Sequence, residues 1–587
     1  MRSTFVVGAV AIASLFGSAC GDNNAPPDGT YSIGGSISGL AADGLIVQDN
    51  GGDDLAVASG STTFVFATPV GGGSAYAVTV RVQPAGEVCS VTAGSGTAVA
   101  DVRSVAIACA PQQGGAGQWT WEGGSDTAPD YGRPGVYGTL GTAAAGNIPG
   151  GRHQSASWRD AAGNLWLFGG FGVDSAGASG QLDDLWKFDP AARAWTWISG
   201  SKVAPASTTG GAGGSAGVYG TLGTPAATNV PGGREQVSAW VDASGAVWIF
   251  GGEGIDGFGV TGELNDLWRF SAGTWTWMGG SDSVGSPLVF GGPAGVYGTL
   301  GTPAATNVPG GRYGAVNWMD ADGNLWLFGG SGIDASGFAG SLDYLNDLWK
   351  YTPGTGTWTW MAGPSTVPAG PPHGAAGIYG TLGTPASTNY PGGRDAAMSW
   401  RDAAGNVWIF GGIGIDSTGT FGFLNDLWKY TPTTGTWTWV SGSNTVGQEN
   451  GGASGVYGTL GTPGAANVPG GRFSSAAWID GTGTFWLLGG QGYDSAGGLG
   501  VLNDLWKFDP TAGTWTWMSG SNTIGASGGQ PGVYGALGVP SDGNVPGSRF
   551  GVPTWTDASG KLWLFGGLGN DSAGDQGYLD DLWSYQP

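Results

Sequence analysis

The chain is dominated by short apolar runs separated by turns that are rich in glycine and proline. Runs of this length are typical of β-strands rather than helices. From Gln118 onward four such runs form a unit that recurs about every 79 residues, six times in all. The unit carries fixed motifs: Gly-Gly-Arg leading to a Trp, a run ending in Gly-Gly, Leu-Asn/Asp-Asp-Leu-Trp, and Trp-Thr-Trp. One four-stranded sheet cannot cover its own faces, so six of them predict an all-β fold, a six-bladed β-propeller over residues 118–587.

Residues 29–110 have a different pattern, with β-type runs such as Thr63–Phe66 and Tyr76–Val82 and no repeat. This segment predicts a small Ig-like β-sandwich, followed by a linker at 111–117, and nothing in it carries chemistry. We expect it to be a spacer. Cys89 and Cys109 both fall here, and in an exported chain they predict a disulfide; two buried free thiols are the alternative.

The first 20 residues have the charged start, apolar stretch and small residues of a secretory signal, and the stretch is too short to span a bilayer. Cys20 follows Ser-Ala and precedes a polar tether at 21–28. It resembles the lipidation site of bacterial lipoproteins, although Gly17 stands where that motif prefers Leu or Val. We therefore expect export and a lipid anchor at Cys20 on the bacterial cell envelope or surface; cleavage and secretion without lipid is the alternative.

The composition limits the classes of partner that the protein can bind. The 122 Gly among 587 residues would suit a disordered chain, but 30 Trp provide large side chains for a core. The formal net charge of −23 disfavours nucleic acid and anionic membrane surfaces as partners. Membrane association is expected only through Cys20, and the sequence does not indicate an oligomeric state.

The order of motifs, from a strand ending in Gly-Gly through Asn-Asp-Leu-Trp-Lys-Phe to a Trp-containing strand, resembles the kelch repeat, as in the central domain of galactose oxidase. The resemblance covers residues 118–587 and implies a kelch-type β-propeller, but fold alone does not imply function. A copper oxidase of that type would need several His and a Tyr-Cys link. The repeat region has no Cys and only His153 and His373, which argues against this chemistry.

The last copy stops before a Trp-Thr-Trp run, whereas Gln118–Trp121 precedes the first copy. We expect this N-terminal strand to complete the last sheet. The long connections, which include the segment Gly217–Thr224 and its equivalents, should lie on one rim. They form either a binding surface or a collar that stiffens the ring.

Six arginines begin the innermost strands and are expected to ring the channel mouth. They could bind a carboxylate or sulfate, or pair with the six Asp of the Asp-Leu-Trp motif. These arginines are Arg152, Arg234, Arg312, Arg394, Arg472 and Arg549.

The residue after each of these arginines differs in nearly every copy. Such variation among repeats predicts an off-axis ligand pocket, with relaxed drift as the alternative. These residues are His153, Glu235, Tyr313, Asp395, Phe473 and Phe550. Blade two adds Glu253 and Glu263 near Glu235, which are either a pair for acid/base work on a sugar or solvated loop acids.

A Gly-x-Asp loop motif recurs in each copy and could bind Ca²⁺, but one carboxylate per loop also suits an Asx turn. Its aspartates are Asp174, Asp256, Asp334, Asp416, Asp494 and Asp571. No other cofactor is expected.

Two functions remain. The first is a non-catalytic surface protein that binds an extracellular protein or glycan through the long-loop face. The second is a sugar epimerase or mutarotase at the channel mouth, with His153, Arg234 and Glu235 as candidates.

Overall fold

The structure is a computed structural model that describes residues 29–84, 87–111, 117–206, 213–285, 291–337, 343–368 and 370–587. The expected signal peptide, tether and lipidation site at Cys20 lie outside the described residues. The chain divides into two compact units, Met1–Gln112 and Gln113–Pro587. In the described ranges the only helix is a single 3-10 turn, Pro129–Tyr131, and none is long and apolar enough to cross a membrane.

The first unit is a sandwich of two four-stranded sheets, β5-β2-β10-β8 and β4-β3-β7-β9, with a small pair β1-β6. Its strands are β1 Thr30–Tyr31, β2 Ile33–Ser38, β3 Leu45–Asp49, β4 Asp53–Val57, β5 Thr63–Val65, β6 Val70–Gly71, β7 Ala75–Val82, β8 Glu87–Thr92, β9 Ser95–Thr97 and β10 Val102–Pro111. Alternating apolar positions such as Ile33, Val47 and Ile107 are 0–1% exposed and form one core between the sheets. The expected disulfide joins Cys89 on β8 to Cys109, the residue opposite on β10.

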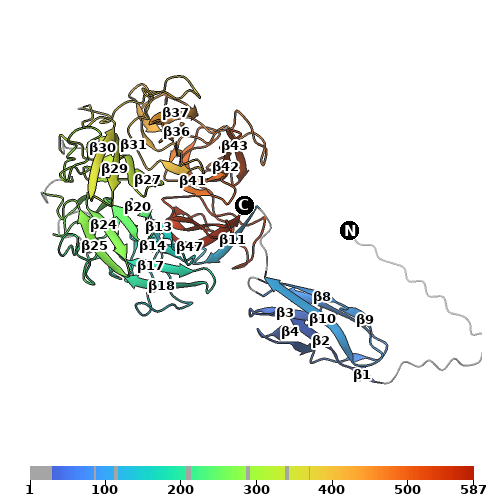
Figure 1. Ribbon diagram of the computed structural model, residues 1–587. Helices are drawn as coiled ribbons and strands as arrows, with labels where there is room; N and C mark the ends of the chain where they lie inside the picture. Colours follow the sequence, from blue (N-terminus) through green and yellow to red (C-terminus); the bar gives the residue numbers. More distant parts are fainter. Residues whose placement is uncertain are drawn as a thin grey trace, which may run out of the picture. The chain divides into compact units, whose positions relative to one another are not determined.

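The second unit is propeller-like, with its sheets arranged around a ring (Figure 1). The first sheet runs outward as β13 Ala156–Arg159, β14 Leu165–Phe168, β17 Leu185–Asp189 and β18 Ala194–Ser199. The second is β20 Ser238–Val241, β21 Val247–Phe250, β24 Leu267–Ser271 and β25 Thr274–Gly279. The third is β27 Val316–Met319, β28 Leu325–Gly332, β29 Asp343–Thr352 and β30 Thr357–Ala362. The fourth is β32 Met398–Arg401, β33 Val407–Phe410, β36 Leu427–Thr431 and β37 Thr436–Ser441.

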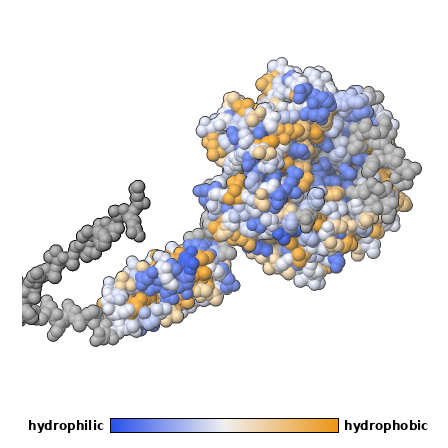
Figure 2. Space-filling model, turned by 180° about the vertical axis from the view of Figure 1, so that it is seen from behind, coloured by the Kyte–Doolittle hydropathy of each residue, from blue (hydrophilic) through white to orange (hydrophobic). Residues whose placement is uncertain are grey.

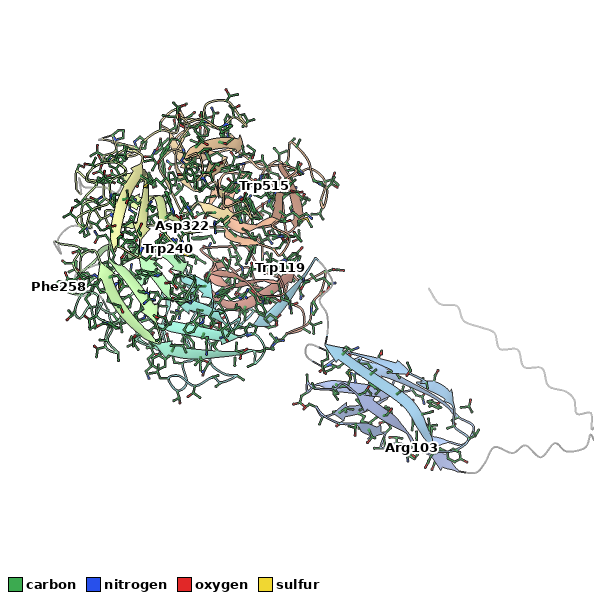
Figure 3. All side chains as sticks on the ribbon, in the orientation of Figure 1. Arg103, Trp119, Trp240, Phe258, Asp322 and Trp515 are labelled. Atoms are coloured by element: carbon green, nitrogen blue, oxygen red, sulfur yellow. A yellow bond between two sulfur atoms is a disulfide. The ribbon has the colours of Figure 1, made fainter. Side chains whose placement is uncertain are left out.

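The fifth sheet is β40 Ala476–Ile479, β41 Phe485–Tyr493, β42 Leu499–Asp509 and β43 Thr514–Ser519. The last is β45 Thr554–Thr556, β46 Leu562–Asn570, β47 Gln576–Gln586 and β11 Gln118–Gly123. Adjacent innermost strands contact one another all the way round, from β13 through β20, β27, β32, β40 and β45 back to β13. In Figure 3, Trp240 on the inner strand β20 lies near the middle of the ring and Phe258 lies at its outer edge.

The two ends of the repeat region meet in the last sheet. β11 pairs antiparallel with β47, opposing Trp119 to Tyr585 and Trp121 to Trp583. The expected completion of the last sheet by the N-terminal strand is therefore present.

Tryptophan fills the spaces between neighbouring sheets. One cluster joins Trp318 and Trp326 of the third sheet to Trp428 and Trp437 of the fourth, all at most 7% exposed. Five equivalent clusters occupy the other interfaces in the described residues. Each sheet thus covers the face of its neighbour, as the four-run unit requires.

Shorter strands continue each unit toward the rim that carries the long loops. The first strand of each set begins at the repeated arginine: β12 Arg152–His153, β19 Arg234–Glu235, β26 Arg312–Tyr313, β31 Arg394–Asp395, β39 Arg472–Phe473 and β44 Arg549–Phe550. The others are β15 Phe171–Val173, β16 Ser179–Gln181, β22 Glu253–Ile255, β23 Thr261–Glu263, β34 Ile413–Ile415, β35 Phe421–Phe423 and β38 Gly451–Gly452. In the third, fifth and last units the equivalent strands are extensions of β28, β29, β41, β42, β46 and β47.

A closed belt of backbone hydrogen bonds surrounds the axis immediately after these arginines. Each member donates its N–H to the carbonyl of the preceding unit at 2.6–3.1 Å, and the first member donates to the last. All six have positive φ, between 49° and 65°. The members are Gln154, Gln236, Gly314, Ala396, Ser474 and Gly551. Four of them are not glycine, at a cost of roughly 1 kcal/mol each, and the belt offsets this cost.

The long segment between units packs against the outermost strand of the sheet that follows it. Gly141 donates its N–H to the Trp197 carbonyl of β18 at 2.8 Å, and Asn147 donates to the Trp195 carbonyl at 3.1 Å. Equivalent bonds occur in all six units. These segments cover an otherwise open sheet edge, which is the collar arrangement.

Candidate functional site

Each repeated arginine belongs to a fully buried hydrogen-bond network. Arg152 donates from Nη1 to Asp184 Oδ1 at 2.6 Å and from Nη2 to Oδ2 at 2.8 Å, and both side chains are 0% exposed. Tyr137 Oη and Trp186 Nε1 also donate to Asp184 Oδ2. Because Tyr137 lies in the segment between units, the network ties the collar to the sheet.

The same pairing occurs in every unit: Arg234 with Asp266, Arg312 with Asp347, Arg394 with Asp426, Arg472 with Asp504 and Arg549 with Asp581. All these arginines are at most 1% exposed. The expectation of an accessible arginine ring is therefore corrected, because the guanidinium groups are occupied by carboxylates and shielded from solvent. The alternative, structural pairing with Asp, is what the structure contains.

The residues that follow the arginines do come together. Each stands opposite a residue of the second short strand, which in turn stands opposite one of the third, so three side chains lie side by side on one face. We call these sets the rim rows. They are His153-Phe171-Gln181, Glu235-Glu253-Glu263, Tyr313-Ser331-Tyr344, Asp395-Ile413-Phe423, Phe473-Gln491-Val501 and Phe550-Leu568-Tyr578.

Neighbouring rim rows touch one another near the axis. The His153 ring stacks on Tyr578 with centroids 5.4 Å apart and lies 5.9 Å from Phe550, both in the last unit. Its Nε2 lies 3.8 Å from Glu235 Oε2 in the next unit. The rim rows therefore form a continuous surface around the mouth rather than six separate patches.

One part of this surface is acidic. Glu235, Glu253 and Glu263 form one complete rim row, and Asp395 lies two units further on, beyond Tyr313. Glu235, Glu263 and Asp395 are 8%, 4% and 7% exposed. We call these four residues the acidic arc.

The part that follows, in the fourth, fifth and last units, is aromatic. Phe423 lies 5.7 Å from Phe473, which lies 6.2 Å from Phe550, and Tyr578 continues the series through His153. We call Phe423, Phe473, Phe550 and Tyr578 the aromatic arc. Acidic and aromatic side chains are thus unevenly distributed around the mouth, although the framework beneath it is repeated.

Burial pushes the ionisable groups of the mouth toward their neutral forms. The pKa of Glu235 is raised to about 8, mainly by desolvation and further by Glu253, while Gln181 lowers it slightly. Desolvation and Glu253 together raise the pKa of Glu263 to about 7, and desolvation raises that of Asp395 to about 7. The pKa of His153 falls to about 4, again through desolvation. Acid and base therefore face each other without ionising each other at neutral pH.

Several polar atoms of the mouth have no hydrogen-bond partner of normal geometry. They are Oε1 and Nε2 of Gln181, Oε2 of Glu263 and Oδ1 of Asp395. The Gln181 side chain is 1% exposed, and its amide interacts with Glu235 without forming a hydrogen bond of normal geometry. Atoms such as Trp275 Nε1 in the core share this condition, but those at the mouth are acceptors and donors that a ligand there could use.

The Gly-x-Asp aspartates stabilise the loops by accepting backbone hydrogen bonds. Asp174 Oδ1 accepts the backbone N–H groups of Ala176 and Ala178, and its Oδ2 accepts that of Ala204 from the following connection. In the other copies Oδ1 likewise bonds within the loop and Oδ2 accepts an N–H from a neighbouring connection. This is the Asx-turn alternative. Within the described residues no group of three or more His, Cys, Asp or Glu side chains has the arrangement of a metal site.

Two further surfaces lie near the axis and the collar. A cavity of about 270 Å³ is lined by the belt residues, by Ser155 and Ser475 just before the inner strands, and by Thr554 on the inner strand β45.

The collar exposes one Val or Ile and one Leu per unit, for example Val136 and Leu140 at 52% and 53%. Hydrophobic and hydrophilic residues are interspersed on the face seen in Figure 2.

The sequence predicted the first member of each rim row and also singled out Glu253 and Glu263. It missed Phe171, Gln181, Tyr344, Phe423 and Tyr578. A signal was present, because the residue after Gly-Gly and the residue before Leu-Asn/Asp-Asp vary among copies whose flanks are fixed. Only strand pairing shows that these three variable positions are neighbours.

No protein-family model matches the chain, and no curated protein is similar to it in sequence. Among solved structures, the chain is similar to one titled "Structure of YjhT", with 13% sequence identity and a TM-score of 0.40. The match covers 74% of this chain and 95% of the other. A likeness this distant carries no argument about the site, which rests on the geometry above.

Proposed function

We propose that the protein is a non-catalytic, exported binding protein that holds a glycan at the mouth formed by the rim rows. One observation carries the proposal: the residues at three aligned positions vary among the units, while the Arg-Asp-Tyr-Trp network beside them is the same in all six. Packing of the scaffold does not require these positions to differ, whereas a single ligand bound off the axis would contact a different residue in each unit. Aromatic rings beside buried carboxyl groups suit the apolar faces and hydroxyl groups of a sugar.

In this proposal the scaffold is a six-bladed β-propeller of the kelch type, and the first unit is an Ig-like spacer. The circle of inner strands and the motif order support the first assignment. The collar is bound to its own sheets, so we place the ligand at the mouth rather than across a broad loop face.

The proposal is tested on a glycan array with the full chain carrying Cys20→Ser, which prevents lipidation. Binding to a defined set of glycans is expected, and it should be lost in Phe473→Ala but kept in Phe258→Ala, whose side chain is 72% exposed at the outer edge of the ring. Absence of any glycan signal would overturn the proposal and redirect the search to extracellular protein partners.

Export and anchoring at Cys20 form a separate part of the proposal, supported by the sequence of residues 1–28. Expression in a bacterial host with radiolabelled palmitate should label the native chain and not Cys20→Ser. An unlabelled, soluble native chain would favour secretion without lipid.

A sugar epimerase or mutarotase is the second candidate, favoured by the 3.8 Å approach of His153 Nε2 to Glu235 Oε2. A protonated carboxyl group can donate a proton to the ring oxygen of a sugar while a neutral imidazole accepts the proton of the anomeric hydroxyl, which opens the ring; reclosure on the other face reverses both transfers. Arg234 drops out of the candidate set, because it is bonded to Asp266 and 0% exposed. Anomeric exchange followed by NMR should be accelerated by the native chain and not by Glu235→Gln if this candidate is correct.

A further inference from the structure

We propose that the acidic arc recognises a protonated amine, so that the glycan of the proposed function, on which this inference rests, is an amino sugar with a free amino group. The group recognised is the ammonium, and the sugar ring supplies the hydroxyl groups and apolar face around it.

The first argument is the missing cation. In the described part of the chain, no Lys or Arg forms an ion pair with Glu235, Glu253, Glu263 or Asp395. The nearest arginines are already neutralised by their own aspartates. Among the described residues His153 is the only basic side chain within ion-pair distance of the arc, and burial lowers its pKa to about 4. Buried carboxyl groups are normally paired, so an arc without a partner fits a ligand that brings the positive charge.

The second argument is independent of charge and comes from Gln181. Its buried amide lies beside Glu235, at the end of the rim row of the preceding unit, and neither Nε2 nor Oε1 forms a hydrogen bond of normal geometry. A hydroxyl group both donates and accepts, so one or two sugar hydroxyls would satisfy this amide. Oε2 of Glu263 and Oδ1 of Asp395 offer further acceptors.

The third argument is the aromatic arc at the mouth. Phe473, Phe550 and Tyr578 offer ring faces to the C–H face of a pyranose, and aromatic faces also attract an ammonium group. An acidic sugar is disfavoured, because the chain has a net charge of −23 and its six mouth arginines are already paired.

The test uses three β-1,4-linked trisaccharides that differ at one substituent: the glucosamine trimer, its N-acetylated form and the glucose trimer. Binding to the full chain with Cys20→Ser is measured by calorimetry at pH 7. The glucosamine trimer should bind at least about tenfold more tightly than either neutral trimer, because only it carries the charge that the acidic arc lacks.

Glu253→Gln should weaken binding of the glucosamine trimer at least about tenfold while leaving the weak binding of the glucose trimer unchanged. Glu449→Gln, at an exposed loop position, is the matched control and should leave all affinities unchanged. Thermal melting of both variants without ligand shows whether the fold is intact.

Binding should also release protons, which a purely structural role for the acids would not produce. Glu235 faces His153, Gln181, Glu253 and Tyr578, and Glu253 faces Glu263 and Tyr313. With pKa values raised to about 7 and 8, Glu263 and Glu235 hold protons at pH 7 that an incoming ammonium would displace. Calorimetry in buffers of different ionisation enthalpy should therefore show net proton release, which Glu253→Gln diminishes.

The outcomes separate this inference from the proposed function. Equal affinity for all three trimers, or hits on the glycan array confined to neutral sugars, would overturn amine recognition and leave the glycan proposal standing. If ethanolamine bound as tightly as the glucosamine trimer, the glycan proposal would be overturned, because the site would then recognise only the ammonium group and not the sugar.

Discussion

Arg152 and Asp184 face each other through two parallel hydrogen bonds of 2.6 and 2.8 Å with neither side chain exposed to solvent. Tyr137 and Trp186 complete the bonding of the carboxylate. A charge pair this deeply buried is stable only while it is complete, because either partner alone would be an uncompensated charge.

Arg152→Ala should therefore destabilise the second unit by about 3 to 5 kcal/mol, measured by denaturant unfolding. Arg269→Ala is the control. Its partner Asp242 lies 3.9 Å away and its side chain is 33% exposed, so a loss of about 1 kcal/mol or less is expected. Equal losses in the two variants would contradict the structural role assigned to the buried pair.

Trp119 and Trp515 occupy equivalent outermost strands but differ in connectivity (Figure 3). β11 has no short chain connection to the last sheet and is held there by pairing with β47 and by bonds from the collar, whereas a short turn joins β43 to β42. Trp119→Ala should free the closing strand and accelerate protease cleavage within Gln118–Gly123. Trp515→Ala should lose about 3 to 5 kcal/mol of stability, as large core truncations do, without this new cleavage. Identical digestion patterns would argue against closure by β11.

Glu235 makes the stability of the native chain depend on pH. Its folded pKa of about 8 lies above the ordinary value of 4.5 for a glutamate, so its favourable contribution is complete below pH 4.5 and is lost as pH rises through 8. Glu235→Gln should leave the melting temperature unchanged near pH 4.5. At pH 9 it should raise stability by roughly 2 to 4 kcal/mol, since each pKa unit corresponds to about 1.4 kcal/mol. Matching melting curves at pH 9 would show that the carboxyl group is not buried as described.

In each of the six loop aspartates both carboxylate oxygens accept backbone N–H groups, as in Asp416. Calcium or a chelator should therefore leave the melting temperature of the protein unchanged. Asp416→Ala should lower stability by about 1 to 3 kcal/mol through the loss of these bonds. A rise in melting temperature on adding calcium that disappears in Asp416→Ala would restore the calcium alternative.

Much of this architecture could be predicted from the repeat. Four apolar runs per unit, a fixed Trp set and a spare Trp-Thr-Trp run at the start are local signals, and they predicted the sheets, their order and the strand that completes the last one. The carboxylate partners of the arginines could also be anticipated, because one Asp per Arg recurs at a constant position.

Whether those arginines are exposed at the mouth or buried against the aspartates could not be decided from the sequence. A ring of guanidinium groups and a buried Arg-Asp pair have the same sequence pattern, and only the depth of each strand decides between them. The rim rows were hidden for a related reason, since Glu235, Glu253 and Glu263 are separated along the chain and become neighbours only through strand pairing.

By itself the sequence determined the repeat, the four strands of each unit, the Trp core and the closing strand, because these depend on periodicity and local turn chemistry. The tertiary structure alone decided which polar groups are buried against each other and which meet at the mouth. Burial and pairing are properties of packed neighbours, and a one-dimensional pattern does not specify how far each side chain lies from water.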